Sequence, residues 1–219
     1  MSLPVYFVSP ERMAGTKGRF AACGWHCTPD GVLAAPAQHA SADALVFDDR
    51  APLPTEPDGL IAPILDEAKR LGAAAIVLDF ERPHSPAARA LAQALAEDFP
   101  TAAPEACCAG RCTPIACYCP SRQTFPEFLA RARGWIELRP IRETVRYPLE
   151  PPAEIRAGQA YFSELLQCSY RAEQRADGLV LELFDTPESF RGRFALIKDR
   201  FIAAIGVRRE LEAFGLGDS

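Results

Sequence analysis

Short apolar segments alternate along the chain with longer segments in which apolar residues recur at helical spacing. Residues 44–47 form one apolar segment, and residues 60–71 after it carry apolar side chains three or four positions apart. Residues 73–78 form the next apolar segment, and Ser85 and Pro86 have the order that caps and opens a helix. Strand, helix, strand is the order from which parallel sheets are built. The pattern therefore predicts two consecutive β-α units.

The same alternation continues toward the C-terminus. An apolar segment at 114–118 leads to Thr124 and Glu127, whose spacing is that of a helix-capping box. A helix is also expected from Thr186 onward, because apolar residues after it lie along one helical face. Further strands are expected at 5–8, 135–138 and 203–207.

The region from about 143 to 178 breaks this rhythm. Residues 167–173 and 178–184 flank an Ala-Asp-Gly turn, which predicts an antiparallel hairpin inserted into the β-α pattern. Residues 143–166 carry no pattern that assigns them a role.

The expected strands lie near residues 5, 45, 76, 115, 136, 180 and 205, with one more between 20 and 33. About eight strands alternating with helices predict an α/β fold, a small (β/α)8 barrel of the TIM type in which residues 1–219 form a single domain. Because 219 residues is short for such a barrel, some helices are expected to be reduced, with the small hairpin inserted near the seventh strand. An open doubly wound sheet is the alternative, but no Gly-x-Gly-x-x-Gly segment follows any expected strand.

Charge and hydropathy narrow the classes of partner. The 24 lysines and arginines and the 29 aspartates and glutamates give a net charge of −5, and the basic residues are scattered. Nucleic acid is therefore not an expected partner. No apolar run approaches the ~20 residues that cross a bilayer, and no secretory leader pattern opens the sequence. We expect no membrane association and a cytoplasmic location, and the oligomeric state stays open.

Eight cysteines are spread over the chain. In a chain of this length without a leader pattern, reduced and mostly buried thiols are expected rather than a disulfide framework. The alternative is a zinc site, because Cys23 and Cys27, with Cys108 and Cys112, have the spacing of two ligand pairs. We predict no metal and no cofactor.

Candidate chemistry follows the strand at 73–78. Asp79 and Glu81 are two positions apart, so both side chains point to the same side of a strand. In a (β/α)8 barrel the carboxyl ends of the strands form the active face. Burial and mutual repulsion should raise the pKa of one carboxyl, and a protonated carboxylic acid beside an ionised one suits glycosidic cleavage. The alternative is a solvated strand end at which Glu81 pairs with Arg82.

Two separate stretches resemble the family 18 glycoside hydrolases, the chitinase-like family. Residues 74–81, Ala-Ala-Ile-Val-Leu-Asp-Phe-Glu, are similar to the end of the family motif Asp-x-x-Asp-x-Asp-x-Glu. Residues 184–193, Phe-Asp-Thr-Pro-Glu-Ser-Phe-Arg-Gly-Arg, and Ile-Gly-Val at 205–207 resemble a helix and the last barrel strand of the family, and the hairpin before them resembles that of bacterial members.

This resemblance implies a hydrolase acting on N-acetyl-hexosamine glycans, such as N-acetylglucosamine polymers, by retaining cleavage. In that family the N-acetyl oxygen of the substrate is the nucleophile. Glu81 matches the general acid of the family, and Asp79 matches the aspartate that orients the N-acetyl group.

The sequence also departs from the family. Ala74 and Val77 stand where the motif has its two earlier aspartates, and Arg208 stands about where the family has a tryptophan beneath the sugar. Residues 135–140 do not match the Tyr-Asp of the family's sixth strand. These departures favour a second hypothesis, a non-catalytic chitinase-like barrel, or pseudoenzyme, that binds a carbohydrate or a protein partner.

Both hypotheses place a polar ligand at the mouth of the barrel. The predicted substrate-binding residues are Asp48, Tyr118, Glu137, Arg139, Tyr170 and Arg208. Charged and polar side chains that converge on a pocket suit carbohydrate binding. The alternative is that these charges pair with one another and serve only the fold.

Overall fold

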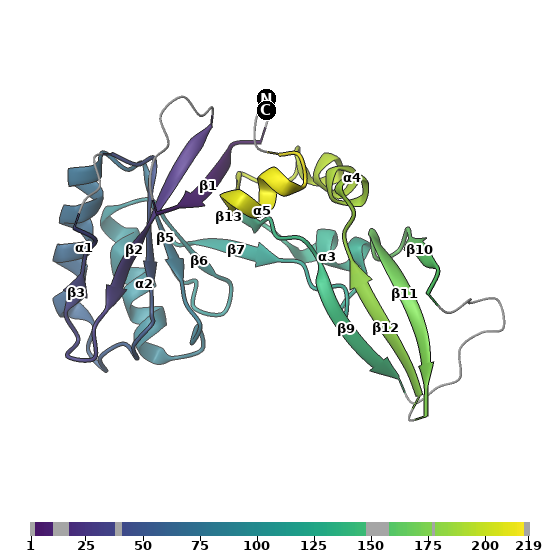
Figure 1. Ribbon diagram of the computed structural model, residues 1–219. Coiled ribbons are helices and arrows are strands. Elements are labelled where there is room, and N and C mark those ends of the chain that lie inside the picture. Colours follow the sequence, from purple (N-terminus) through teal and green to yellow (C-terminus); the bar gives the residue numbers. More distant parts are fainter. Residues whose placement is uncertain (1–2, 11–17, 38–40, 148–157, 177, 217–219) are drawn as a thin grey trace.

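The computed structural model describes residues 3–10, 18–37, 41–147, 158–176 and 178–216. Within these residues, eight parallel strands form a barrel (Figure 1). They are β1 (Val5–Ser9), β2 (Arg19–Cys27), β4 (Ala44–Asp48), β5 (Ala75–Asp79), β6 (Thr101–Pro104), β7 (Thr113–Cys117), β8 (Trp135–Glu137) and β13 (Ala203–Val207). The ring closes because β1 pairs with both β13 and β2. The predicted α/β barrel is confirmed, with the short β3 (Leu33–Ala34) outside the ring.

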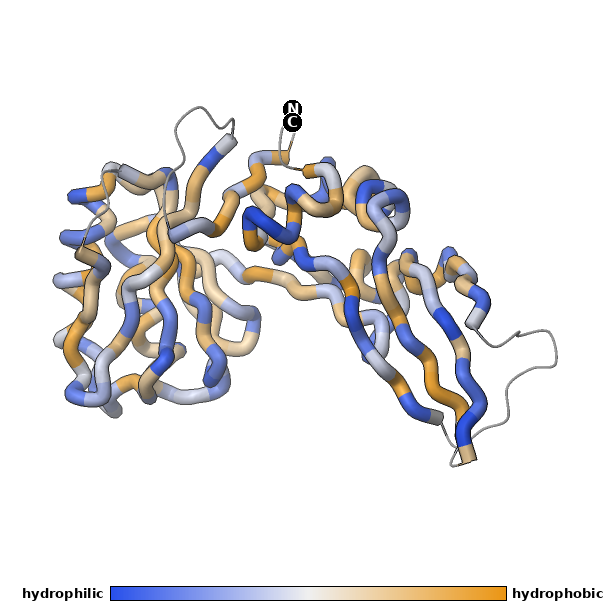
Figure 2. Tube along the Cα trace, viewed as in Figure 1, coloured by the Kyte–Doolittle hydropathy of each residue, from blue (hydrophilic) through white to orange (hydrophobic). Residues whose placement is uncertain are grey.

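Helices cover part of the outside of the barrel. They are α1 (Asp58–Leu71), α2 (Pro86–Asp98), α3 (Phe125–Arg131), α4 (Pro187–Ile197) and α5 (Arg208–Ala213). Ser85 caps α2, and Thr124 forms the predicted capping box with Glu127. Figure 2 shows hydrophilic stretches recurring along α1 between hydrophobic ones, as expected for a helix with one buried face. Residues 105–112 join β6 to β7 without a helix, so the expected reduction of helices is confirmed.

The interior of the barrel is packed with small side chains around two large rings. Tyr6 and Trp135 stack with their ring centroids 4.8 Å apart. The strands around them contribute alanines at inward positions, namely Ala21, Ala44, Ala75, Ala102 and Ala203. The small alanine side chains leave room in the narrow interior for the two stacked rings, and Val46, Val77 and Ile205 fill the remaining space. The barrel is therefore a filled core, and its chemistry lies at the strand ends.

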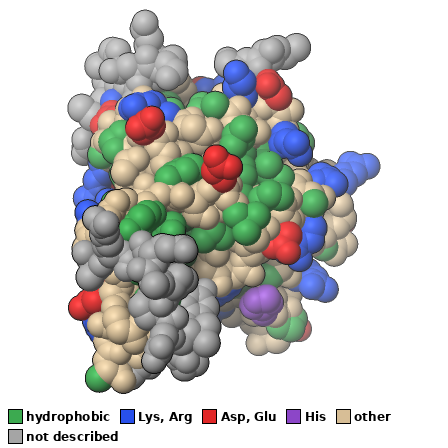
Figure 3. Space-filling model, turned by 90° about the vertical axis from the view of Figure 1, so that its right-hand side faces the viewer, with side chains coloured by type: hydrophobic (Ala, Val, Ile, Leu, Met, Phe, Trp, Pro, Cys, Tyr) green, Lys and Arg blue, Asp and Glu red, His purple; other side chains and the backbone are tan. Residues whose placement is uncertain are grey.

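A second sheet is inserted between β8 and α4. It contains β9 (Arg142–Tyr147), β10 (Ala160–Ser163), β11 (Cys168–Arg175) and β12 (Gly178–Phe184) in the order β10-β11-β12-β9, all antiparallel. The predicted hairpin is the β11–β12 pair. Hydrophobic side chains gather on the side of the molecule where this sheet lies (Figure 3). Phe162 of β10 and Leu165, which follows β10, are exposed. None of the described helices is both long and apolar enough to cross a membrane.

Two strand assignments made from sequence are corrected. Residues 178–184 form β12 of the inserted sheet and do not belong to the barrel. The missing barrel strand is β6, with the sequence Thr-Ala-Ala-Pro, which lacks the β-branched and aromatic residues that mark a strand. Including β6 makes Trp135–Glu137 the seventh strand of the barrel, so residues 135–140 do not correspond to the sixth strand of the family. The sixth strand is β7, which continues into Tyr118 and Cys119.

Candidate active site

A pocket of about 440 Å³ opens at the carboxyl ends of the barrel strands. Its charged lining residues are Asp79 of β5, Glu137 of β8, Arg139 just beyond β8, and Glu210 of α5. Cys117 of β7 adds a thiol, and the other lining residues are apolar or glycine. The size lies within the range of about 300–1,000 Å³ that is usual for small-ligand sites. The pocket occupies the face at which barrel enzymes perform their chemistry.

Asp79 is the carboxylate of this pocket whose pKa is raised by several neighbouring carboxylates. It pairs in register with Asp48 of the neighbouring strand, and its side chain faces the pocket. Asp79 is exposed at the end of β5, and partial desolvation by the surrounding protein is the main cause of its raised pKa. The negative charges of Glu137, Asp48, Asp49 and Glu81 raise the pKa further, in that order. Asp79 thus retains a proton to a higher pH than an ordinary aspartate.

Glu137 and Cys117 lie on adjacent strands and in register at the mouth. The pKa of Cys117 is raised to about 12 by burial first and then by the charge of Glu137 and a hydrogen bond with it. The thiol therefore stays protonated at neutral pH and is a poor nucleophile. Arg139 is exposed beside them and is the cation of the pocket. The described pocket offers carboxylates and a guanidinium, a set that suits hydroxyl and amide groups of a sugar.

Replacing Glu137 with glutamine is expected to lower the pKa of Asp79. Among the neighbouring charges, that of Glu137 raises this pKa most, and glutamine removes the charge while keeping the side-chain shape. A carboxyl whose pKa is raised on folding lowers stability as pH rises from its unfolded value through its folded value. E137Q should therefore be more stable than the parent protein at neutral pH, with the difference shrinking below about pH 4. Carbon-13 NMR titration of Asp79 and melting temperatures across pH measure both effects. An unchanged Asp79 titration would contradict the prediction.

Glu81 lies beyond the end of β5 and is exposed. It is not among the described residues that line the 440 Å³ pocket, although its charge reaches Asp79. Its backbone N–H donates to Oδ1 of Asp49 at 2.7 Å. Asp49 is almost completely buried and was not singled out from the sequence. The only signal for it was an Asp-Asp pair at the end of an apolar segment, which did not distinguish the two aspartates.

Two other predicted substrate-binding residues are charged side chains with partners near the mouth. Asp48 forms an ion pair with Arg50, with 3.1 Å between the charged atoms. Arg208 opens α5, pairs with Glu212 at 2.6 Å and lies over the ring of Phe20. For these two, the alternative in which charges pair with one another describes the contacts better than ligand binding does.

The two predicted tyrosines lie away from the pocket, in the layer outside the barrel. The Tyr118 hydroxyl donates to the backbone oxygen of Leu166 at 2.8 Å, and its ring packs against Phe125. Tyr170 belongs to the inserted sheet and stacks on Tyr161. Tyr118 faces outward because it follows Cys117, which faces the pocket, and successive side chains of an extended chain alternate. Neither tyrosine is among the described residues that line the 440 Å³ pocket.

The eight cysteines are free thiols. Cys23 packs with the barrel interior, whereas Cys27 is buried in the cluster between the sheet and α1 and α2. The register shifts between Ala22 and Trp25, which puts these two cysteines on opposite faces of β2. Across the described ranges, no three cysteine, histidine, aspartate or glutamate side chains lie close enough to hold a metal ion. The two cysteine pairs of the alternative zinc site therefore do not converge.

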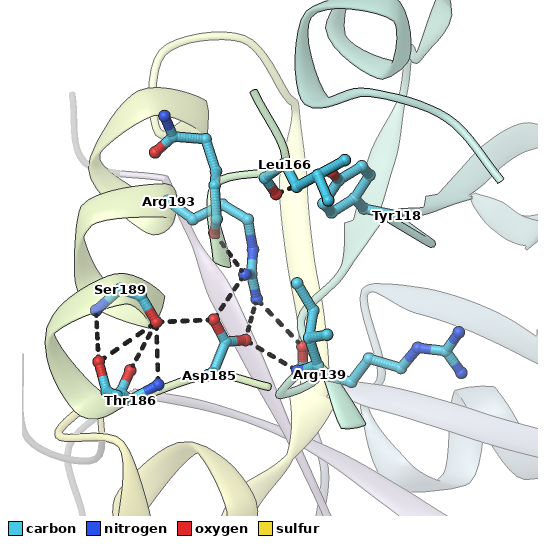
Figure 4. A network of polar contacts seen from close by, with 9 residues as sticks. Tyr118, Arg139, Leu166, Asp185, Thr186, Ser189 and Arg193 are labelled. Atoms are coloured by element: carbon cyan, nitrogen blue, oxygen red, sulfur yellow. Dashed lines mark hydrogen bonds and ion pairs between the residues drawn. The ribbon is translucent and has the colours of Figure 1, made fainter. Parts of the chain in front are cut away.

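A buried polar network centred on Asp185 and Arg193 lies close to Arg139 (Figure 4). Asp185 accepts hydrogen bonds from both terminal nitrogens of Arg193, at 2.8 and 2.6 Å, and from Ser189 at 2.9 Å. Asp185 also accepts the backbone N–H of Ile141, and Arg193 donates to the backbone oxygen of Arg139 at 3.4 Å. The network thus ties α4 to the segment that follows Glu137.

Comparisons with known proteins bear on the fold. No protein-family model and no curated protein sequence matches this chain. The crystal structure of the spore cortex-lytic enzyme SleL of Bacillus cereus is similar, with a TM-score of 0.58 and 12% identity. That of Bacillus megaterium QM B1551 SleL has a TM-score of 0.53 and 12% identity, and each comparison covers 99% of this chain and 74% of the other. The chain has the SleL fold.

Proposed function

We propose that this protein hydrolyses glycans that contain N-acetyl-hexosamine, with retention at the anomeric carbon. The observation that carries the proposal is the place of Asp79 and Glu81 at the carboxyl end of the fourth barrel strand, beside the 440 Å³ pocket. That place agrees with the family resemblance of residues 74–81. The likeness of the fold to two spore cortex-lytic enzymes supports a glycan as the substrate.

In the proposed reaction Glu81 donates a proton to the glycosidic oxygen while the N-acetyl oxygen of the substrate bonds to the anomeric carbon. The bond to the leaving sugar breaks in the same step. Glu81, now ionised, then takes a proton from the water that opens the cyclic intermediate, so the enzyme returns to its first state. Asp79 accepts the N–H of the acetamide and holds its oxygen toward the anomeric carbon. Arg139 and Glu137 bind substrate hydroxyls around it.

The experiment compares fluorogenic oligosaccharides of N-acetylglucosamine with the matching glucose oligosaccharides. Cleavage of the first set only, with the product released in the anomeric configuration of the substrate by proton NMR, is the expected result, since glucose lacks the acetamide nucleophile. Equal cleavage of both sets would contradict participation of the acetamide. No cleavage of either set would contradict hydrolysis of these glycans.

The second candidate function is a non-catalytic barrel that binds a carbohydrate. It is favoured by the absence of Glu81 from the described lining of the pocket, and by Val77, which lines the pocket where the family motif has an aspartate. This function predicts a saturable rise in melting temperature with N-acetylglucosamine oligosaccharides and no turnover. Turnover would exclude it.

A further inference from the structure

Asp49 is a buried carboxylate whose side-chain hydrogen bonds, within the described structure, go to the turn that carries Glu81. It follows β4, and 1% of it is exposed. Its Oδ1 accepts the backbone N–H of Glu81 at 2.7 Å, and its Oδ2 accepts that of Arg82 at 3.1 Å. The Arg82 guanidinium donates to the Asp49 carbonyl oxygen at 2.8 Å and lies 3.8 Å from Oδ2. Both carboxylate oxygens therefore hold one short stretch of backbone.

Such a residue is unfavourable unless these bonds form. Removing a carboxylate from water is costly, and only strong hydrogen bonds or a cation offset that cost. Bonds from N–H groups to an ionised carboxylate are stronger than those between neutral groups. What Asp49 stabilises is local, because residues 80–82 belong to no helix or strand of the described structure. Its bonds therefore specify the conformation of this turn.

The turn is thus held at both ends. Asp79 is fixed by the pairing of β5 with β4, and residues 81 and 82 are fixed by Asp49. With its backbone held, the Glu81 carboxylate can move only by rotation about its own side-chain bonds. Preorganisation of this kind reduces the entropy lost when an acid must meet a substrate oxygen.

We propose that Asp49 is the positioning residue of this site, which holds the Glu81 backbone so that the Glu81 carboxylate is presented beside Asp79. Its kinetic consequence rests on the proposed function. The order it imposes on the turn does not, and can be measured without any substrate.

Asp49 has a second effect that packing alone would not give. Its charge is one of the four carboxylate charges that raise the pKa of Asp79, together with Glu137, Asp48 and Glu81. Neutralising Asp49 should therefore lower the pKa of Asp79 and move the acidic limb of any pH–rate profile to lower pH.

The test uses the full chain and the variant D49N. An asparagine offers one acceptor oxygen in place of two, and its amide nitrogen would face an N–H donor. Hydrogen exchange at the backbone amides of Glu81 and Arg82, followed by NMR, should become about tenfold to a hundredfold faster, as for the loss of a charge-assisted hydrogen bond. Asp43→Asn is the matched control. Asp43 immediately precedes β4, at the end opposite to Asp49, and its Oδ2 likewise accepts a backbone N–H, that of Phe20. D43N should leave the exchange at both turn amides unchanged.

The titration of Asp79 is followed in the same samples and should shift to lower pH in D49N. With a cleaved glycan, kcat should fall more than KM changes. Unchanged exchange at both amides would overturn the positioning role, and an unchanged Asp79 titration would overturn the electrostatic effect of Asp49 on Asp79. If D49N does not fold, hydrogen exchange in the parent protein tests the proposal instead. The backbone amides of Glu81 and Arg82 should then exchange as slowly as those of β5. Exchange at these amides as fast as in an unstructured peptide would overturn the proposal. Failure of the parent protein to cleave any glycan contradicts the proposed function but leaves these two measurements intact.

Discussion

Replacing Glu81 with glutamine is expected to lower kcat/KM for N-acetylglucosamine oligosaccharides by about a hundredfold to ten-thousandfold, because a general acid contributes that much to proton transfer. Glutamine has nearly the same shape and cannot donate the required proton. The side chain is exposed, so the fold should be retained, with a change in stability within about 0.5 kcal/mol. Steady-state kinetics and a melting curve measure the two effects.

The identity of the leaving group provides an internal check on that result. A substrate with an acidic leaving group needs little proton donation, so E81Q should lose much less activity on an aryl glycoside of an acidic phenol than on an oligosaccharide. Glu182→Gln is the control, because Glu182 is an exposed carboxylate on β12 of the inserted sheet. Equal losses on both kinds of substrate would assign Glu81 a role other than general acid.

Replacing Asp185 with asparagine is expected to destabilise the protein by about 3–5 kcal/mol, because Arg193 would be left buried without its counter-charge. The side chain of Asp185 is 0% exposed, and that of Arg193 is 9% exposed. For a domain of this size the loss corresponds to a fall of roughly 6–20 °C in melting temperature. Chemical denaturation of the parent protein and D185N measures the difference.

Two further variants separate this buried pair from ordinary ion pairs. Glu173→Gln removes the partner of Arg175 in an exposed pair and should cost less than about 1 kcal/mol. A double variant with Asp185→Leu and Arg193→Met removes both buried charges and should recover part of the stability lost in D185N. If D185N and Glu173→Gln have equal effects, the network shown in Figure 4 does not stabilise the barrel.

Much of the fold could be predicted because most barrel strands carry their own local signal. The β5 segment is a continuous apolar run, and the helices after β5 and β7 begin with a capping residue that is followed within two positions by a proline. By contrast, β6 consists of four small residues, and only its pairing with β5 and β7 makes it a strand. The apolar segment at 178–184 was assigned to the barrel because a strand pattern does not specify which sheet the strand joins.

The candidate site divides in the same way. Asp79 and Glu81 could be found because they adjoin one recognisable strand. Glu137 and Arg139 line the pocket, since both follow the alternation of an inward-facing strand. Tyr118 directly follows Cys117, the pocket-facing residue at the end of β7, so its ring points the opposite way, into the outer layer.

By itself, the sequence determined the β-α alternation, the barrel class, the capped helices and the acidic segment after the fourth strand, because these depend on residues that are close together along the chain. Only the tertiary structure decided that Glu137 opposes Asp79, that Asp49 holds the turn of Glu81, and that Arg208 is paired. Each of these contacts joins residues from different strands or loops. Closure of the barrel and strand register set such distances, and no spacing along the sequence encodes them.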